Sequence, residues 1–152
     1  MEPVTIRLCQ ACEIYNAPNA AVLWDEYARE AMPAELSYHA PQVEAYERLY
    51  QAGVLHPFGA FRGDELVGVL AMIVTQVPHY DRPIATTESF FVCADARKGG
   101  AGTGLLKAAE NHAKALGARA LFISAPANSR LDLILPKVGY RLSNHIFVRG
   151  LV

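Results

Sequence analysis

The sequence is poor in the features that mark secreted, membrane and nucleic-acid-binding proteins. Its 152 residues include three cysteines, and 14 Lys and Arg nearly balance 15 Asp and Glu, for a net charge of -1 at pH 7. Without a dense basic run, neither nucleic acid nor an anionic membrane is expected as the main partner. No stretch approaches the roughly 18 apolar residues of a membrane helix, and the start lacks the basic and apolar segments of a signal peptide. We expect one soluble, cytoplasmic domain over residues 1–152.

Too few cysteines are present for a disulfide framework or an evident zinc site. Cys9 and Cys12 form one C-x-x-C pair, whereas a zinc site needs a second pair of ligands and a thioredoxin-like motif would begin a helix. Here the pair follows an expected strand, so we predict reduced thiols and no metal. Cys93 is interpreted as a packed small residue and not as a nucleophile.

What the sequence does contain is a 52% hydrophobic composition arranged in two periods. Alternation predicts strands over residues 4–8, 58–62, 66–75, 84–92, 120–124, 140–142 and 145–152. Helical spacing predicts helices over residues 20–31 and 43–51, from about 102 to the stop at Gly117, and from about 128 to 138, where Pro136 limits the helix. The Gly63-Asp64 turn predicts a hairpin. The pattern indicates an α/β (α+β) fold with mostly antiparallel strands.

The most informative stretch is a strand that runs through glycines into a helix. It extends from Phe90 to Leu106 and contains Gly99, Gly100, Gly102 and Gly104. Glycines permit a tight turn and a close approach of backbone N–H groups to an anion, and the helix N-terminus adds about half a positive charge. Arg97 and Lys98 supply full charges beside it. The stretch therefore predicts a phosphate-binding loop.

Two familiar phosphate loops do not fit this spacing. A P-loop requires Lys and then Ser or Thr directly after its last glycine, but Leu105 and Leu106 follow Gly104. A dinucleotide fingerprint starting at Gly100 requires a small residue at the position of Leu105 and an acidic residue about 20 positions later, where apolar and small residues lie. Nucleoside triphosphates and dinucleotides are therefore disfavoured as ligands.

The spacing Arg-x-x-Gly-x-Gly, formed by Arg97, Gly100 and Gly102, resembles the GNAT superfamily of acyl-CoA N-acyltransferases. Val92 before the loop, Asn128 after the next strand and the pair Gly139-Tyr140 stand in the same order as in that family. The resemblance implies a single-domain fold with a mixed, mostly antiparallel sheet and helices on both faces. It also implies coenzyme A binding by Phe90, Phe91, Val92, Arg97, Lys98, Gly99, Gly100, Ala101, Gly102, Thr103, Gly104 and Asn128.

The activity that the resemblance implies is N-acetyl transfer from acetyl-CoA to an amine of a small molecule or protein in a ternary complex. Glu88 is the candidate base, since alternation places it on the strand face of Val92 and many relatives carry glutamate there. Two other roles stay open for Glu88: a clamp for a cationic acceptor, or an exposed carboxylate without function. Leu135 stands where many relatives have a tyrosine that protonates the leaving thiolate. Tyr140 occupies a position that is usually in the core.

The acceptor site is the least determined part of the sequence. The resemblance implies that Glu35, Tyr38 and His39 line it, although they are equally expected as surface loop residues. His112 is interpreted as a helix-flank residue. Two other functions stay open: a non-catalytic acyl-CoA-binding or regulatory domain, and an α/β interaction module without a nucleotide site. The sequence is also compatible with a homodimer.

Overall fold

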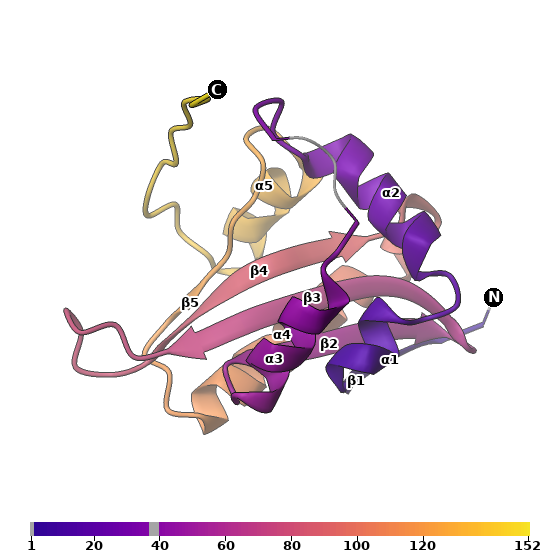
Figure 1. The fold of residues 1–152 in the computed structure, drawn as a ribbon, viewed down its shortest axis with the longest axis horizontal. Helices are drawn as coiled ribbons and strands as arrows, with labels where there is room; N and C mark the ends of the chain where they lie inside the picture. The colour runs from indigo at the N-terminus through magenta and orange to yellow at the C-terminus, as the bar shows by residue number, and fades with distance from the viewer. Residues whose placement is uncertain (1, 37–39) are drawn as a thin grey trace.

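A five-stranded sheet forms the centre of the protein, which we describe from a computed structural model over residues 2–36 and 40–152. Its strands lie in sequence order (Figure 1): β1 (Val4–Leu8), β2 (Leu55–Arg62), β3 (Glu65–Thr75), β4 (Ile84–Val92) and β5 (Leu121–Phe122). The first four pair antiparallel and β4 pairs with β5 in parallel. The expected fold class, with a mixed and mostly antiparallel sheet, is confirmed.

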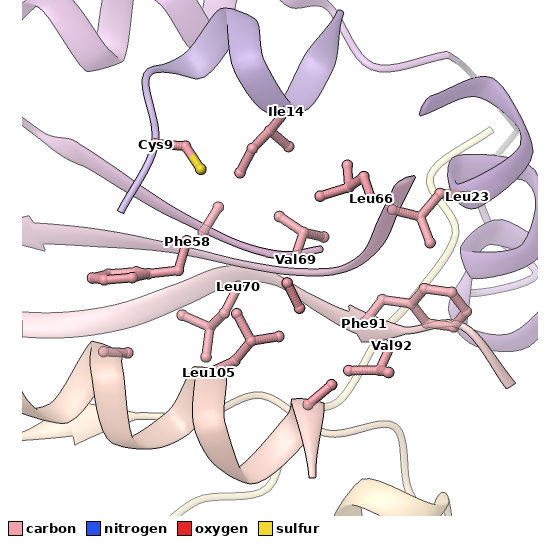
Figure 2. Close-up of a cluster of buried hydrophobic side chains, with 14 of the residues drawn as sticks. Cys9, Ile14, Leu23, Phe58, Leu66, Val69, Leu70, Phe91, Val92 and Leu105 are labelled. Carbon is pink, nitrogen blue, oxygen red and sulfur yellow. The ribbon is translucent and has the colours of Figure 1, made fainter. Parts of the chain in front are cut away.

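Helices cover both faces of this sheet. On one face lie α1 (Ala11–Tyr15), α2 (Ala20–Ala31) and α3 (Val43–Gln51), and on the other lies α4 (Ala101–Ala115), as Figures 1 and 2 show. After β5 come α5 (Arg130–Ile134) and the short 3-10 helix η2 (Leu135–Val138). None of the helices in the described part of the chain is long and apolar enough to cross a membrane.

The core consists of two apolar layers, one on each face of β3. Figure 2 shows Leu70 directed toward Leu105 of α4, while Val69 lies on the face covered by Ile14 of α1. All four side chains are fully buried. A strand covered by helices on both faces needs apolar residues at successive positions, which explains the long hydrophobic run of β3.

A β-bulge in β4 changes the direction of its side chains. Ser89 pairs with Ala71 and Thr87 pairs with Met72, so Glu88 between them has no partner of its own in β3. An extra residue on one strand shifts the alternation of side chains by one position. Positions before and after the bulge therefore cannot be assigned to faces by simple period-two counting.

The helices differ from the sequence-based expectation in two places. The helix α1 was not predicted, because five residues are too few to show a period. Its start is held by Glu13, which accepts a hydrogen bond from the Gln10 backbone N–H at 2.6 Å. The last predicted helix is confirmed but divides into α5 and η2, with Pro136 in the first turn of η2. Proline lacks an N–H and so limits the α-helical segment.

The C-terminal segment also departs from the prediction. Residues 140–142 and 145–152 were expected as closing strands, but they form no strand, and every residue from 141 to 152 is exposed. β propensity depends on pairing and burial, and β5 itself pairs with β4 at only two positions. The segment instead runs back toward the α2–α3 connection, where Gly150 lies beside the Glu35 side chain.

Candidate functional site

The glycine-rich loop lies at the N-terminus of α4. A 3-10 helix, η1 (Ala94–Gly99), follows β4, and Gly100 then turns the chain with φ of +81° into α4. This left-handed conformation favours glycine. Because Gly100 has no side chain, it cannot cap the helix, and the first N–H groups of α4 lack partners within the helix. The 15-residue helix thus presents an uncapped, electropositive end.

Gly102 and Gly104 of this loop have different structural roles. A Cβ atom at Gly104 would lie 3.0 Å from Ile6 Cγ1, so this glycine lets α4 pack closely on β1. A Cβ atom at Gly102 would meet only Val92 Cγ2, at an ordinary 3.9 Å. Packing therefore does not require glycine at Gly102, which agrees with a position kept open for a ligand.

Two carboxylates one turn apart on α2 hold the loop in place. Glu26 accepts a hydrogen bond from the Ala94 backbone N–H at 2.8 Å, and Glu30 forms an ion pair with Arg97. Arg97 also donates from Nε to the Val92 carbonyl at 2.9 Å, and its guanidinium lies 5.4 Å from the centre of the Phe91 ring. Arg97 thus joins the end of β4 to α2. The neighbouring Lys98 is exposed.

Beside the loop, β4 has an open edge. β5 pairs with β4 only at Ala85 and Thr86, and the next contact runs through a side chain, from the Ser124 N–H to Thr87 Oγ1 at 3.1 Å. From Glu88 to Val92, β4 has no strand partner on this side in the described chain. The two strands diverge here and leave this side of β4 without a strand partner next to the glycine-rich loop.

Glu88 projects from the bulge toward α3. Its Oε1 accepts a 2.6 Å hydrogen bond from the Tyr46 hydroxyl, whereas Val92 lies on the α4 side near Gly102. The prediction that Glu88 shares a face with Val92 is therefore wrong, because the bulge shifts the alternation between them. Burial, together with this hydrogen bond to a carboxylate, raises the pKa of Tyr46 well above its usual value.

A row of packed aromatic rings connects Glu88 with the end of β4. Ring centres are 3.9 Å apart for Tyr46 and Tyr15, 5.5 Å for Tyr15 and Trp24, 6.0 Å for Trp24 and Tyr27, and 5.0 Å for Tyr27 and Phe91. The Tyr27 hydroxyl accepts the Phe90 N–H at 3.4 Å. Sequence analysis missed Tyr27 and Tyr46 as site residues. The sequence signal that could have indicated them is a tyrosine on the buried side of a helix, because a buried hydroxyl needs a hydrogen-bond partner.

Other predicted residues lie outside this arrangement. Asn128 adopts a left-handed conformation with φ of 63° two residues before α5, and its N–H donates to Asp132 at 2.8 Å. Leu135 is buried, and the hydroxyl of Tyr140 donates to Glu110 on α4 at 2.8 Å. Glu35 is exposed. The remaining acceptor-site candidates, Tyr38 and His39, fall outside the described residues.

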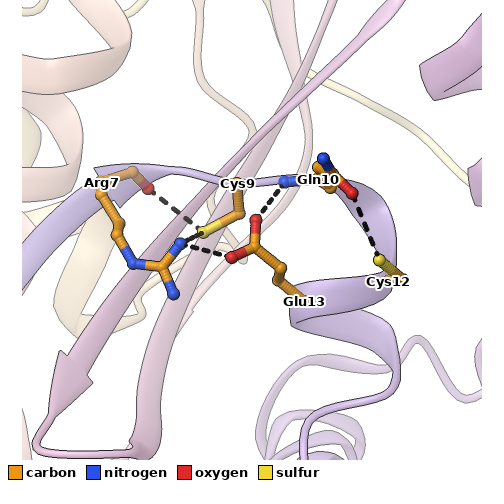
Figure 3. Close-up of polar contacts among 5 residues, drawn as sticks. All are labelled: Arg7, Cys9, Gln10, Cys12 and Glu13. Carbon is orange, nitrogen blue, oxygen red and sulfur yellow. Dashed lines mark hydrogen bonds and ion pairs between the residues drawn. The ribbon is translucent and has the colours of Figure 1, made fainter.

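The cysteines form no evident reactive centre. Figure 3 shows that Cys9 and Cys12 point apart, with Arg7 and Glu13 forming a 2.7 Å ion pair beside Cys9. Cys93 Sγ donates to Asp95 at 3.0 Å, and burial raises the pKa of Cys93 to about 12, which keeps it a thiol. No group of three or more His, Cys, Asp or Glu side chains within the described ranges could hold a metal ion.

Comparison with known families identifies the class of protein. The profile described as "Acetyltransferase (GNAT) family" matches residues 20–132, which span α2 to α5 and include the glycine-rich loop and Glu88. The chain belongs to the GNAT acetyltransferase family. No curated protein matches the chain.

Solved structures show the same fold at low sequence identity. An aminoglycoside acetyltransferase from an uncultured soil metagenomic sample, crystallised with sisomicin, is 17% identical with a TM-score of 0.71, covering 96% of this chain and 95% of its own. A ribosomal-protein-alanine N-acetyltransferase from Brucella melitensis biovar Abortus 2308 is 19% identical with a TM-score of 0.70 and coverages of 96% and 97%. A putative acetyl transferase from Pyrococcus furiosus is 20% identical, with a TM-score of 0.70 and coverages of 97% and 99%.

Proposed function

We propose that the protein transfers the acetyl group of acetyl-CoA to an amine, with both substrates bound at once. One observation carries this proposal: the open edge of β4 has the glycine-rich loop near one end and Glu88 at the other. From Glu88 to Val92 the strand rises about 13 Å, at about 3.3 Å per residue. An extended ligand with its phosphates at the loop would therefore place its other end near a carboxylate.

The residues of the loop fit a pyrophosphate. The uncapped N–H groups of α4, the left-handed turn at Gly100 and the space beside Gly102 can accept an anion at close range. Exposed Lys98 adds a positive charge. We assign coenzyme A binding to residues 97–104 and to the β4 backbone at Phe90, Phe91 and Val92, with Asn128 as a further predicted contact.

Glu88 is the proposed base. The amine nitrogen attacks the thioester carbonyl carbon, a C–N bond forms, and the C=O electron pair moves to oxygen. Glu88 accepts the proton that the nitrogen loses. Oε2 is the oxygen that takes this proton, because Oε1 already accepts the hydrogen bond from Tyr46. The C=O bond then re-forms as the C–S bond breaks, and the thiolate takes a proton from solvent because Leu135 supplies none. Glu88 releases its proton to solvent, which restores the carboxylate. The acetylated amine and free coenzyme A leave.

The apolar Leu135 favours one other candidate, a coenzyme-binding regulatory domain that has lost turnover. Calorimetry with acetyl-CoA tests the loop, and release of free thiol tests transfer with a panel of monoamines, polyamines, amino acids, aminoglycosides and lysine peptides. Binding with turnover supports the proposed function. Binding without turnover on any acceptor supports the regulatory domain, and absence of binding overturns both in favour of an interaction module.

A further inference from the structure

We propose that the Tyr27 hydroxyl and the Phe90 backbone N–H together form the site that stabilises the oxyanion of acyl transfer, which makes Tyr27 a catalytic residue. The inference rests on the proposed function, because it assigns a role in that same reaction. It starts from the position of Tyr27, whose Oη lies 3.4 Å from the Phe90 nitrogen at the open edge of β4.

The two donors are spaced to share one oxygen. An oxygen atom can lie about 2.9 Å from both a nitrogen and a hydroxyl oxygen that are 3.4 Å apart, which is the usual length of such hydrogen bonds. Oxyanion sites are built from fixed donors of this kind, directed at the position where negative charge develops. The Phe90 N–H faces away from β3, and in the described chain no strand covers it.

Packing fixes the Tyr27 ring in this position. The ring stacks on Phe91 with centres 5.0 Å apart and planes 10° apart, and the centre of the tilted Trp24 ring lies 6.0 Å away. Burial also raises the pKa of Tyr27, so the hydroxyl keeps its proton at neutral pH and can donate it in a hydrogen bond. A donor that is already held in place needs little reorganisation during the reaction.

Binding of the acyl donor changes the partner of each group. Without ligand, Tyr27 Oη accepts the Phe90 N–H. When a thioester carbonyl enters, its oxygen takes over the Phe90 N–H, and the Tyr27 O–H rotates to donate to the same oxygen. As the nucleophile adds, both hydrogen bonds strengthen with the charge on oxygen, and Tyr27 keeps its proton. Collapse of the intermediate re-forms C=O, breaks C–S and releases the thiolate.

The other hydroxyls near the site have different environments. Tyr46 donates to Glu88, and Tyr140 donates to Glu110. Tyr15 lies in the same row of rings, and its buried hydroxyl is near the Ser89 side chain of β4 and not near the Phe90 N–H. Tyr15 thus offers a control, since Tyr15→Phe removes the same atom from a neighbouring ring and leaves the Tyr27 hydroxyl and the Phe90 N–H in place.

The test uses hydroxylamine as the nucleophile. It is small and largely uncharged at neutral pH, so it needs neither the true acceptor nor a base to remove a proton before attack. Formation of acetohydroxamate from acetyl-CoA is followed for the wild-type protein, Tyr27→Phe and Tyr15→Phe, with acetyl-CoA affinity measured in parallel. We expect Tyr27→Phe to lower the maximal rate by about 10²-fold at unchanged affinity, the usual effect of losing one oxyanion donor. Tyr15→Phe should keep the wild-type rate.

Each outcome decides a different point. A wild-type protein that accelerates hydroxamate formation, with an equal rate for Tyr27→Phe, overturns the role of Tyr27 and leaves the proposed function standing. A wild-type protein that binds acetyl-CoA without accelerating the reaction overturns both. If Tyr27→Phe does not fold, 3,5-difluorotyrosine at position 27 provides the second variant. Its more acidic hydroxyl should ionise and lose the rate at lower pH than the wild type does, which a purely structural ring would not cause.

Discussion

Tyr46 of α3 donates a 2.6 Å hydrogen bond to Glu88 at the bulge of β4, and the two residues are 42 positions apart in the chain. The bulge directs Glu88 away from α4 and toward this hydroxyl. Tyr46 therefore orients the carboxylate through one oxygen, and the other oxygen is the one that we propose takes the proton of the amine. The pair couples the helical face of the site to the strand along which the acyl donor is proposed to lie.

This relationship predicts graded effects on turnover. Glu88→Gln, which is nearly isosteric but cannot take a proton, should lower kcat by about 10²-fold or more while acetyl-CoA affinity stays nearly constant. Tyr46→Phe should lower kcat by about tenfold, the value of one hydrogen bond to a charged group. Steady-state kinetics and calorimetry measure both. Unchanged turnover in Glu88→Gln would make the carboxylate structural, and a rise in acceptor KM alone would make it a charge clamp.

The glycine-rich loop gives a prediction that separates binding from folding. Acetyl-CoA at a hundredfold excess over its Kd should stabilise the wild-type protein by about 2.7 kcal/mol. Gly102→Val should abolish this stabilisation yet keep the melting temperature of the free protein, because a Cβ atom there meets only ordinary contacts. Thermal unfolding with and without ligand measures both quantities.

Gly117→Ala is the opposite control for that experiment. Gly117 has φ of +82° at the end of α4, far along the helix from the loop, and an L residue there costs about 1–2 kcal/mol. This variant should melt earlier while its acetyl-CoA affinity equals that of the wild type. A folded Gly102→Val protein with wild-type affinity would remove the loop from the coenzyme site.

Much of the fold could be predicted from patterns that depend on local sequence. Strand alternation, the hairpin at Gly63 and the strand, glycine and helix order all report local backbone preferences, and all are found in the structure. The C-terminal strands could not be predicted correctly, because residues 145–152 alternate well but pairing depends on an available partner edge. The short α1 was missed for the converse reason, since tertiary contacts of Ile14 and Tyr15 stabilise it.

The site was only partly predictable. The position of the loop between β4 and α4 could be predicted from its glycines, because the left-handed backbone at Gly100 favours glycine. The direction of Glu88 does not, because a bulge is a property of two paired strands and one strand's sequence does not reveal it. Tyr27 comes near Phe90, and Tyr46 near Glu88, only through packing of α2 and α3 on the sheet. Such contacts carry no signature in spacing.

The ion pair between Glu30 and Arg97 predicts that Glu30 weakens the attraction of Arg97 for the phosphates of the coenzyme. Glu30→Gln removes a negative charge beside the proposed pyrophosphate site and should tighten acetyl-CoA binding by up to about fivefold at low salt, in line with about 1 kcal/mol for an exposed pair. The gain should shrink as salt is added. Glu47→Gln on α3 carries the same charge change away from the loop and should leave affinity unaltered. Weaker binding in Glu30→Gln would show that positioning of Arg97 matters more than its free charge.

A histidine pair predicts loss of stability in mild acid. His112 Nε2 lies 3.0 Å from His56 Nδ1, joining α4 to β2. Burial lowers the pKa of both residues, and the charge of His112 lowers that of His56 further. The unfolded chain therefore binds more protons, so the free energy of unfolding is at its full value above about pH 6.5 and falls as the pH drops below it.

Melting temperatures between pH 5 and pH 8 measure this dependence. His112→Gln removes one titrating group and should flatten the decline below about pH 6.5. His145→Gln, on the exposed C-terminal segment, should reproduce the wild-type curve. An equally steep decline in His112→Gln would assign the pH dependence to groups other than this pair.

The final prediction concerns how the thiolate leaves. A coenzyme thiol ionises near pH 8.5, so water can protonate the departing thiolate without a dedicated acid, and Leu135 supplies none. Tyr140 donates its hydroxyl proton to Glu110 in a hydrogen bond, and burial raises its pKa well above the usual value, so it is a poor acid. With saturating acetyl-CoA, kcat/KM for the acceptor should rise with pH as the base or amine loses its proton, and then stay level up to about pH 10. Tyr140→Phe should show the same profile, and so should Tyr80→Phe, which changes an exposed tyrosine in the β3–β4 loop. If kcat/KM of the wild type falls below about pH 10 and this fall disappears in one variant, the substituted tyrosine is the acid. That result would overturn the proposal that the thiolate leaves without a protein acid.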